Sequence, residues 1–172
     1  MFEAHFAVQK VSVDTVFENG KPISRVVYRF ETERSGRYLI FVKRYDHGFR
    51  TIEFCRKSMK LAKTRFTEMT NKNEASRIIG TVFYHMVALL KAGKADRVSF
   101  GFIGARMPNE DTRATSKRFR IYRKISANLI SPRDYEQLQN DTKGYYLVLN
   151  KLSDRQAVMD IASVVYEKQE EE

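Results

Sequence analysis

The stretch FENGKPISRVVYRFETERSGRYLIFVKRY, residues 17–45, decides the fold class that we expect for this chain. Its Asn19-Gly20 pair favours a two-residue hairpin, because both central positions of a type I′ turn need a positive φ. The apolar residues at positions 26, 28 and 30 share one face of the strand that follows. With two further turns, at Ser35-Gly36 and at 46–48, the pattern predicts four antiparallel strands over residues 5–17, 23–33, 38–45 and 49–55.

The remaining chain alternates helical and extended patterns after a basic connector at residues 56–69. Asn71 or Asn73 can cap a helix that runs to Lys91, with Gly93 as a left-handed C-cap. A strand at 97–103, a loop at 104–115, a helix at 116–130, a strand at 145–150 and a helix at 154–167 follow. We therefore expect an α+β fold, in which a four-stranded antiparallel meander precedes helix, strand, helix, strand and helix. Residues 1–166 form one domain in this interpretation, and residues 167–172 form an acidic tail.

The composition excludes several classes of protein. The single cysteine, Cys55, rules out an intrachain disulfide, and no stretch has the roughly 18 apolar residues of a membrane span. The three histidines are widely spaced, so we expect no metal site, and no cofactor motif or recognised catalytic motif occurs. We expect a non-enzymatic protein of the cytoplasm, or of the host cytoplasm or the virion if a phage encodes it, without a membrane partner.

The charge is strongly positive and clustered. The chain has 31 Lys and Arg against 21 Asp and Glu, a formal net charge of +10. Residues 34–65 hold ten of the basic residues with two acids, and residues 113–133 hold seven with none. Aromatic residues interleave with both groups, a combination suited to phosphate backbones and unpaired bases. The alternative is a solvated basic surface over an ordinary aromatic core. The expected nucleic-acid contacts are Arg37, Lys43, Arg44, Arg50, Arg56, Lys57, Lys60, Lys117, Arg120, Arg123 and Lys124.

The helix at 116–130 is amphipathic, with a basic outer face of Lys117, Arg120, Arg123 and Lys124. Arg118 breaks the pattern because it falls in the apolar half. It either reaches solvent from the first turn, pairs with an acid such as Glu74, or anchors an anionic ligand, since an uncompensated buried charge is costly. Asn71 and Asn73 are the other candidate residues of such an anion site.

Three segments resemble a family of small uncharacterised proteins of tailed phages and prophages, T-even-like phages among them. These are TNKNEASRIIGTV at 70–82, VSF at 98–100 and SKRFRIY at 116–122. The family has a Thr-Gly-x-Gly-Asp-Ala turn before a helix with Thr-Val, and a later helix that opens with Ser-Arg-x-Lys-Leu-Tyr. Asn71 and Asn73 replace the glycines of the turn. The resemblance implies a phage-type origin and no particular activity.

The order of elements is also similar to the C-terminal half of the GNAT acyltransferase fold. In that fold, backbone N–H groups at the start of the central helix bind the pyrophosphate of acetyl-CoA. The glycines of the GNAT turn are absent here, and Glu74 would place a negative charge beside a pyrophosphate. Architecture alone does not carry the activity.

Three functions follow in order of preference. The first is an accessory protein that binds a polyanion, with DNA or RNA as the expected partner. The second is a protein-binding component of a virion, or an inhibitor of a host defence or nucleic-acid-processing factor. The third is a GNAT-like acyltransferase.

Overall fold

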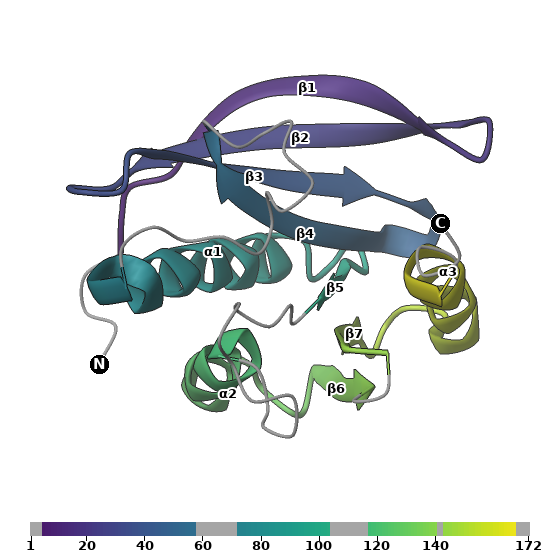
Figure 1. Ribbon diagram of the computed structural model, residues 1–172. Helices are drawn as coiled ribbons and strands as arrows, with labels where there is room; N and C mark the ends of the chain where they lie inside the picture. The colour runs from purple at the N-terminus through teal and green to yellow at the C-terminus, as the bar shows by residue number, and fades with distance from the viewer. Residues whose placement is uncertain (1–4, 58–71, 104–116, 141–142, 168–172) are drawn as a thin grey trace.

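The described part of the chain forms a mixed seven-stranded sheet with three helices, so the expected α+β class is confirmed (Figure 1). The computed structural model describes residues 5–57, 72–103, 117–140 and 143–167, without the side chains of residues 72, 73, 117 and 118. The strands are β1 (Gln9–Glu18), β2 (Lys21–Glu31), β3 (Arg37–Arg44), β4 (Phe49–Arg56), β5 (Ser99–Ile103), β6 (Tyr135–Asn140) and β7 (Tyr145–Asn150). The helices are α1 (Lys72–Ala92), α2 (Lys117–Leu129) and α3 (Arg155–Glu167), and a short 3-10 turn η1 (Asp46–Gly48) joins β3 to β4.

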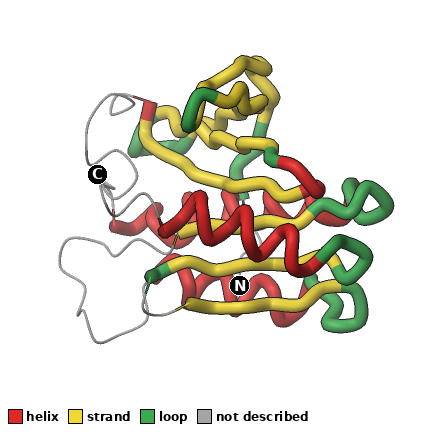
Figure 2. Tube along the Cα trace, turned by 90° about the vertical axis from the view of Figure 1, so that its right-hand side faces the viewer, coloured by secondary structure: helices red, strands yellow, loops and turns green. Residues whose placement is uncertain are grey.

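The strands lie in the order β1-β2-β3-β4-β5-β7-β6, and every neighbouring pair is antiparallel except β4 and β5. These two strands run parallel and share three residue pairs, from Phe49–Ser99 to Thr51–Gly101. Their pairing ends there, although β4 continues to Arg56 and β5 to Ile103. A parallel pair needs a crossover connection, and α1 lies in that connection. Figure 2 shows the strands (yellow) and helices (red) after a quarter turn.

The Asn19-Gly20 turn is as the sequence predicts. Glu18 pairs with Lys21 across it, and φ is +51° at Asn19 and +75° at Gly20. Both central residues therefore have the left-handed backbone that a type I′ turn requires. The turn fixes the register of β1 on β2.

The two faces of the sheet are covered by different helices. On one face, α1 and α2 share a core with the strands, in which Ile78 and Tyr122 lie among residues such as Phe30 and Ile40. On the other face, α3 packs over the start of β4 and over β7. The Tyr166 ring of α3 approaches β5 closely, because a Cβ atom at Gly101 would lie 2.6 Å from the Tyr166 hydroxyl oxygen. Only glycine leaves room for the ring at this position.

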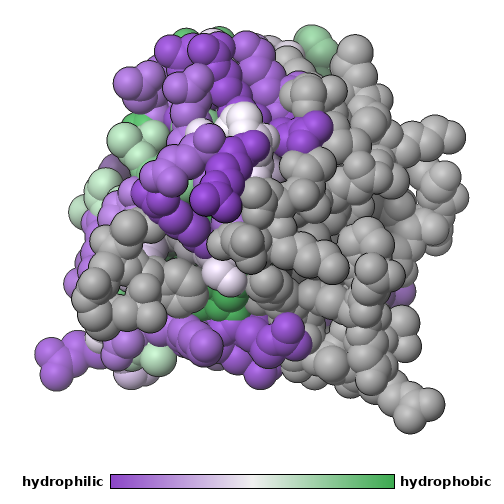
Figure 3. Space-filling model, turned by 60° about the vertical axis from the view of Figure 1, so that its left-hand side comes forward, coloured by the Kyte–Doolittle hydropathy of each residue, from purple (hydrophilic) through white to green (hydrophobic). Residues whose placement is uncertain are grey.

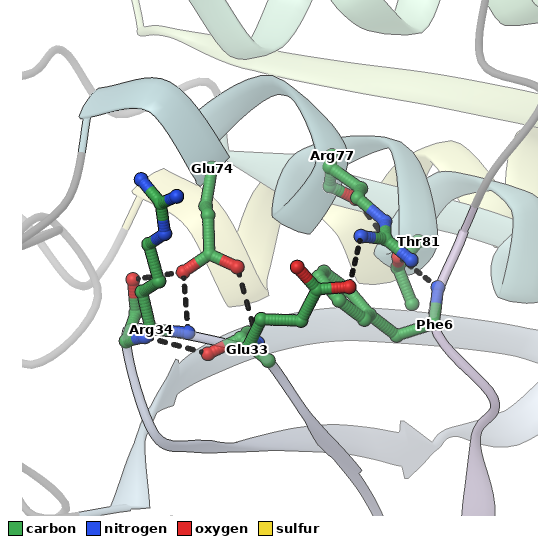
Figure 4. A network of polar contacts seen from close by, with 8 residues as sticks. Phe6, Glu33, Arg34, Glu74, Arg77 and Thr81 are labelled. Atoms are coloured by element: carbon green, nitrogen blue, oxygen red, sulfur yellow. Dashed lines mark hydrogen bonds and ion pairs between the residues drawn. The ribbon is translucent and has the colours of Figure 1, made fainter.

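Glu74 ties the first turn of α1 to the β2–β3 turn, as Figure 4 shows. Its carboxylate accepts hydrogen bonds from the backbone N–H groups of Glu33 and Arg34, both at 3.1 Å, and from Ser35 Oγ at 2.8 Å. Burial alone would raise the pKa of Glu74, but the bonds from Ser35 and the turn backbone outweigh it and hold the pKa below its ordinary value. The sequence led us to place Glu74 at the helix end; its larger role is to close this turn.

The N-terminal segment is anchored on α1 just before β1 begins. The backbone N–H of Phe6 donates to Thr81 Oγ1 at 3.0 Å, and the Arg77 guanidinium lies 3.8 Å from the centre of the Phe6 ring (Figure 4). Thr81 Oγ1 in turn donates to the Arg77 carbonyl. The hydroxyl thus links a residue at the start of the chain to the middle of the central helix.

The expected left-handed C-cap at Gly93 is wrong, because Gly93 does not have a positive φ. A Cβ atom at this position would lie 2.3 Å from Val98 Cγ2. Gly93 is therefore required by the close packing of Val98, not by a left-handed backbone. The residue with a positive φ in this connection is Arg97, at +62°.

Strand β6 was not expected from the sequence. Its residues YEQLQN contain one aliphatic side chain, so the alternation typical of a strand is weak. β6 pairs antiparallel with β7 along its whole length and ends the sheet. A strand at the edge of a sheet with half-buried side chains needs few apolar residues. The sequence pattern of β6 is therefore too weak to predict a strand.

We predict that Glu74→Ala lowers the free energy of unfolding by about 3 kcal/mol, because three donors lose a charged acceptor and the group is buried. Chemical denaturation measures the loss. Glu33→Ala is the matched control, since its exposed carboxylate makes one ion pair at 3.4 Å with Arg77 and should cost less than about 1 kcal/mol. Equal losses in the two variants would contradict the assigned role of Glu74.

Candidate anion-binding site

Two arginines oppose each other at the η1 end of β3 and β4. Arg44 and Arg50 are direct cross-strand partners. They share the strand face of Val42 and Ile52, which lie in the core with α1. Both arginines are therefore on the α1 side of the sheet. Like charges directly opposite each other destabilise a sheet. A group of opposite charge bound between them would offset this cost.

Burial, the like charge of Arg44 and the nearby Tyr28 define the environment of Arg50. Burial lowers the pKa of Arg50, and the Arg44 charge lowers it further, while Tyr28 and Asp96 act in the opposite direction. Tyr28 lies within electrostatic range of both arginines, and its ring meets the edge of the His85 ring with centroids 4.3 Å apart. Within the described residues, no carboxylate lies within ion-pair distance of Arg44 or Arg50. An anion between the two guanidinium groups would relieve their repulsion.

Arg44 also borders a groove of about 880 Å³ between the tip of the β1–β2 hairpin and α3. The groove has an apolar side with Phe17, Ile161 and Val164, and charged residues of both signs around it. Arg44 is itself exposed. A ligand can therefore reach this guanidinium from solvent.

Two of the expected basic contacts lie on the opposite face of the sheet. Arg37 and Lys43 alternate with Tyr38, Ile40 and Val42, so they face away from α1. Arg37 Nε is 2.6 Å from a Glu31 oxygen, and Lys43 Nζ is 2.9 Å from Glu18 Oε1. These two charges already have carboxylate partners, unlike the Arg44–Arg50 pair.

Helix α2 has the amphipathic character that the sequence predicts. Phe119, Tyr122 and Ile125 are buried, whereas Arg120, Arg123 and Lys124 are exposed. Arg123 donates a hydrogen bond to Gln139 of β6, a neutral partner. Because α2 packs in the same core as α1, its basic face and the Arg44–Arg50 pair lie on the same side of the sheet.

The structure thus divides the expected contacts among three places. Arg37 and Lys43 are on the α3 side of the sheet. Arg44, Arg50 and Arg56 are on the α1 side, and Lys57 lies just beyond the end of β4. The remaining described contacts are on α2: Arg120, Arg123 and Lys124. Lys60 and Asn71 lie outside the described residues, as do the side chains of Asn73, Lys117 and Arg118. Hydrophilic side chains cover most of the described part of the face in Figure 3.

The sequence did not indicate that Tyr28 lies within electrostatic range of the arginine pair or that its ring contacts His85. Tyr28 and His85 belong to a strand and a helix far apart in the chain, and only the packing of α1 on β2 brings them together. The Nε2 atom of His85 is buried and has no hydrogen-bond partner within the described residues. No short motif carries such a contact, so it could not be read from residue spacing.

The described residues contain no group of three or more His, Cys, Asp and Glu side chains that could hold a metal ion. His5 stacks on Tyr84 with ring centroids 4.8 Å apart, His47 is exposed in η1, and His85 lies against Tyr28. None of the helices within the described ranges is long and apolar enough to cross a membrane.

The chain matches no family model, no curated protein and no solved structure. The arginine pair and its surroundings must therefore be interpreted from their own chemistry.

We predict that His85 makes the stability pH-dependent, because burial lowers its pKa from 6.5 to about 4. The folded protein keeps His85 neutral while the unfolded chain takes up the proton, so stability falls as the pH drops from about 6.5 towards 4. Urea midpoints across this range should show the decline in the native protein and a shallower one in His85→Phe. An unchanged slope in His85→Phe would refute the assignment.

Proposed function

We propose that this protein is a non-enzymatic accessory protein that binds a polyanion, with nucleic acid as the polyanion, and that the Arg44–Arg50 pair is central to binding. The observation that supports it most is the pair itself: two arginines are direct cross-strand partners, and no carboxylate lies within ion-pair distance of either among the described residues. Nucleic-acid phosphates are spaced along a backbone and can neutralise both guanidinium groups at once.

The surrounding chemistry supports phosphate as the ligand. Arginine binds phosphate oxygens through two parallel N–H donors, and a half-buried guanidinium forms stronger bonds than a fully hydrated one. The exposed cations of α2 lie on the same side of the sheet and add to its positive charge. Binding of this kind depends on the phosphate backbone and carries little base specificity. The phage-type origin implied by the sequence resemblance is part of this proposal.

The salt dependence of binding tests the proposal. With about five phosphates neutralised, the logarithm of the affinity for a short labelled oligonucleotide should fall with the logarithm of salt at a slope of roughly −4 to −5. The double variant Arg44→Gln/Arg50→Gln should flatten that slope by about 2, since two phosphate contacts are lost. Fluorescence anisotropy over a salt series measures both quantities.

Arg37→Gln is the matched control, because this arginine is paired with Glu31 on the opposite face. Its slope should equal that of the native protein. Undetectable binding of DNA and RNA at low salt, or the same slope in the double variant and the native protein, would refute the proposal. Co-purification of a host protein from a nuclease-treated lysate, without nucleic-acid binding, would favour the protein-partner function.

One observation favours a second candidate, a GNAT-like acyltransferase. A four-stranded antiparallel meander leads into α1, and α1 connects the parallel strands β4 and β5, whose pairing stops after three residue pairs. Ligands of open sheets bind where parallel strands end and separate. A GNAT-like layout would place an acyl-CoA there, beside the start of α1.

Acetyl-CoA binding tests this second candidate. At a hundred times its Kd, a ligand that binds only the folded chain stabilises it by about 2.7 kcal/mol, which a thermal-shift measurement detects as a rise in Tm. The Arg44→Gln/Arg50→Gln variant should show the same shift if the cofactor lies beside the start of α1, because Arg50 lies at the opposite end of β4. No shift with acetyl-CoA at millimolar concentration would exclude this candidate.

A further inference from the structure

Among the described residues, strand β1 forms one edge of the sheet (Figure 1), and most of its side chains are exposed. It runs for ten residues and pairs on one side with β2. Val13 and Phe17 are 55% and 72% exposed. Proteins usually protect such an edge with charges, prolines or bulges, because its unpaired N–H and C=O groups can bind another strand. The bulge in β1 lies between Lys10 and Ser12 and leaves residues 12–18 regular.

The backbone groups available for pairing can be assigned from the hairpin. Glu18 and Lys21 flank a two-residue turn and form a hydrogen-bonded pair, and such pairs alternate with non-hydrogen-bonded pairs along antiparallel strands. The N–H and C=O groups of Val13, Thr15 and Phe17 therefore point away from β2. The side chains of these same residues lie on one face of the sheet.

We propose that β1 pairs antiparallel with β1 of a second copy of this chain, about a two-fold axis through Thr15. This register places Val13 opposite Phe17 of the second copy and Thr15 opposite its own equivalent. A β-branched residue opposite an aromatic residue, and threonine opposite threonine, are favourable cross-strand pairs. All outward-pointing backbone groups of Val13, Thr15 and Phe17 find partners in this arrangement.

The charges are compatible with this register. With the axis at Thr15, Asp14 lies opposite Val16 and Ser12 lies opposite Glu18, so no like charges meet. Moving the axis to Asp14 would place two aspartates opposite each other, and moving it to Val16 would place Asp14 opposite Glu18. The Asp14 carboxylate is neutralised within its own chain by Arg25, which donates to it at 2.9 and 2.7 Å. Because β1 can pair with a second β1 without bringing like charges together, a second copy of this chain is a better partner than a charged foreign peptide.

The oligomeric state of the full chain tests the proposal. Sedimentation equilibrium should give a mass that rises with concentration from 20.1 kDa towards twice that value. Phe17→Lys should weaken association by about tenfold, because the two-fold axis makes each substitution act twice. Leu152→Lys, at a residue 59% exposed outside the sheet edge, is the matched control and should leave association unchanged.

A cross-linking experiment tests the register itself. Thr15→Cys should form an intermolecular disulfide on mild oxidation, since a hydrogen-bonded antiparallel pair separates Cα atoms by about 5.5 Å. The native Cys55 is buried and should not compete. Ser12→Cys, which lies opposite Glu18, should not cross-link.

Three outcomes would overturn the proposal: a mass of 20.1 kDa at every concentration, a dimer that Phe17→Lys leaves intact, or cross-linking through Ser12→Cys but not Thr15→Cys. Protection of the Val13 and Phe17 amides from hydrogen exchange only after a foreign protein is added would also overturn it, in favour of another partner. These results do not depend on nucleic-acid binding, because the Arg44–Arg50 pair is not part of the β1 edge.

Discussion

Three residue pairs between β4 and β5 hold the two antiparallel parts of this sheet together, and the rest of the structure depends on that parallel contact. Because parallel strands start at the same end, the chain must return across the sheet between them, and α1 lies in that return. With 21 residues the helix is about 31 Å long, enough to cross the sheet. Its apolar side supplies much of the main core, to which α2 then adds. The helix that satisfies the topology thus also supplies the largest buried surface.

The net charge of +10 is distributed unequally between the two faces of the sheet. On the α3 side, three described basic residues of β2 and β3 pair with carboxylates, in Arg25–Asp14, Arg37–Glu31 and Lys43–Glu18, while Arg29 donates to the neutral Gln9. On the α1 side, Arg44 and Arg50 are direct cross-strand partners. Exposed ion pairs contribute little stability, but they do cancel potential locally. The field that a polyanion would sense is therefore stronger on one side than the overall composition suggests.

The parts of the fold that follow local rules could be predicted from the sequence. Asn19-Gly20 identified the first hairpin, and the alternation in β2 identified the face with Val26, Tyr28 and Phe30 as the one that packs in the core. Strand β6 and the role of Gly93 could not be predicted, because both depend on contacts with distant partners, β7 and Val98. The same limit applies to the site. The sequence shows that the basic residues are clustered. It does not show which face of the sheet each one occupies or which have carboxylate partners, and these two properties of the folded chain distinguish Lys43 from Arg44.

The hydrogen bond from Phe6 to Thr81 has a consequence for the order of events during synthesis. The ribosome makes the N-terminal segment first, yet the hydroxyl that holds it is added 75 residues later. The β1–β2 hairpin can form early from local contacts, but its leading segment has no docking surface until α1 has left the exit tunnel. The segment around Phe6 is therefore made early but docks only after Thr81 of α1 has been made.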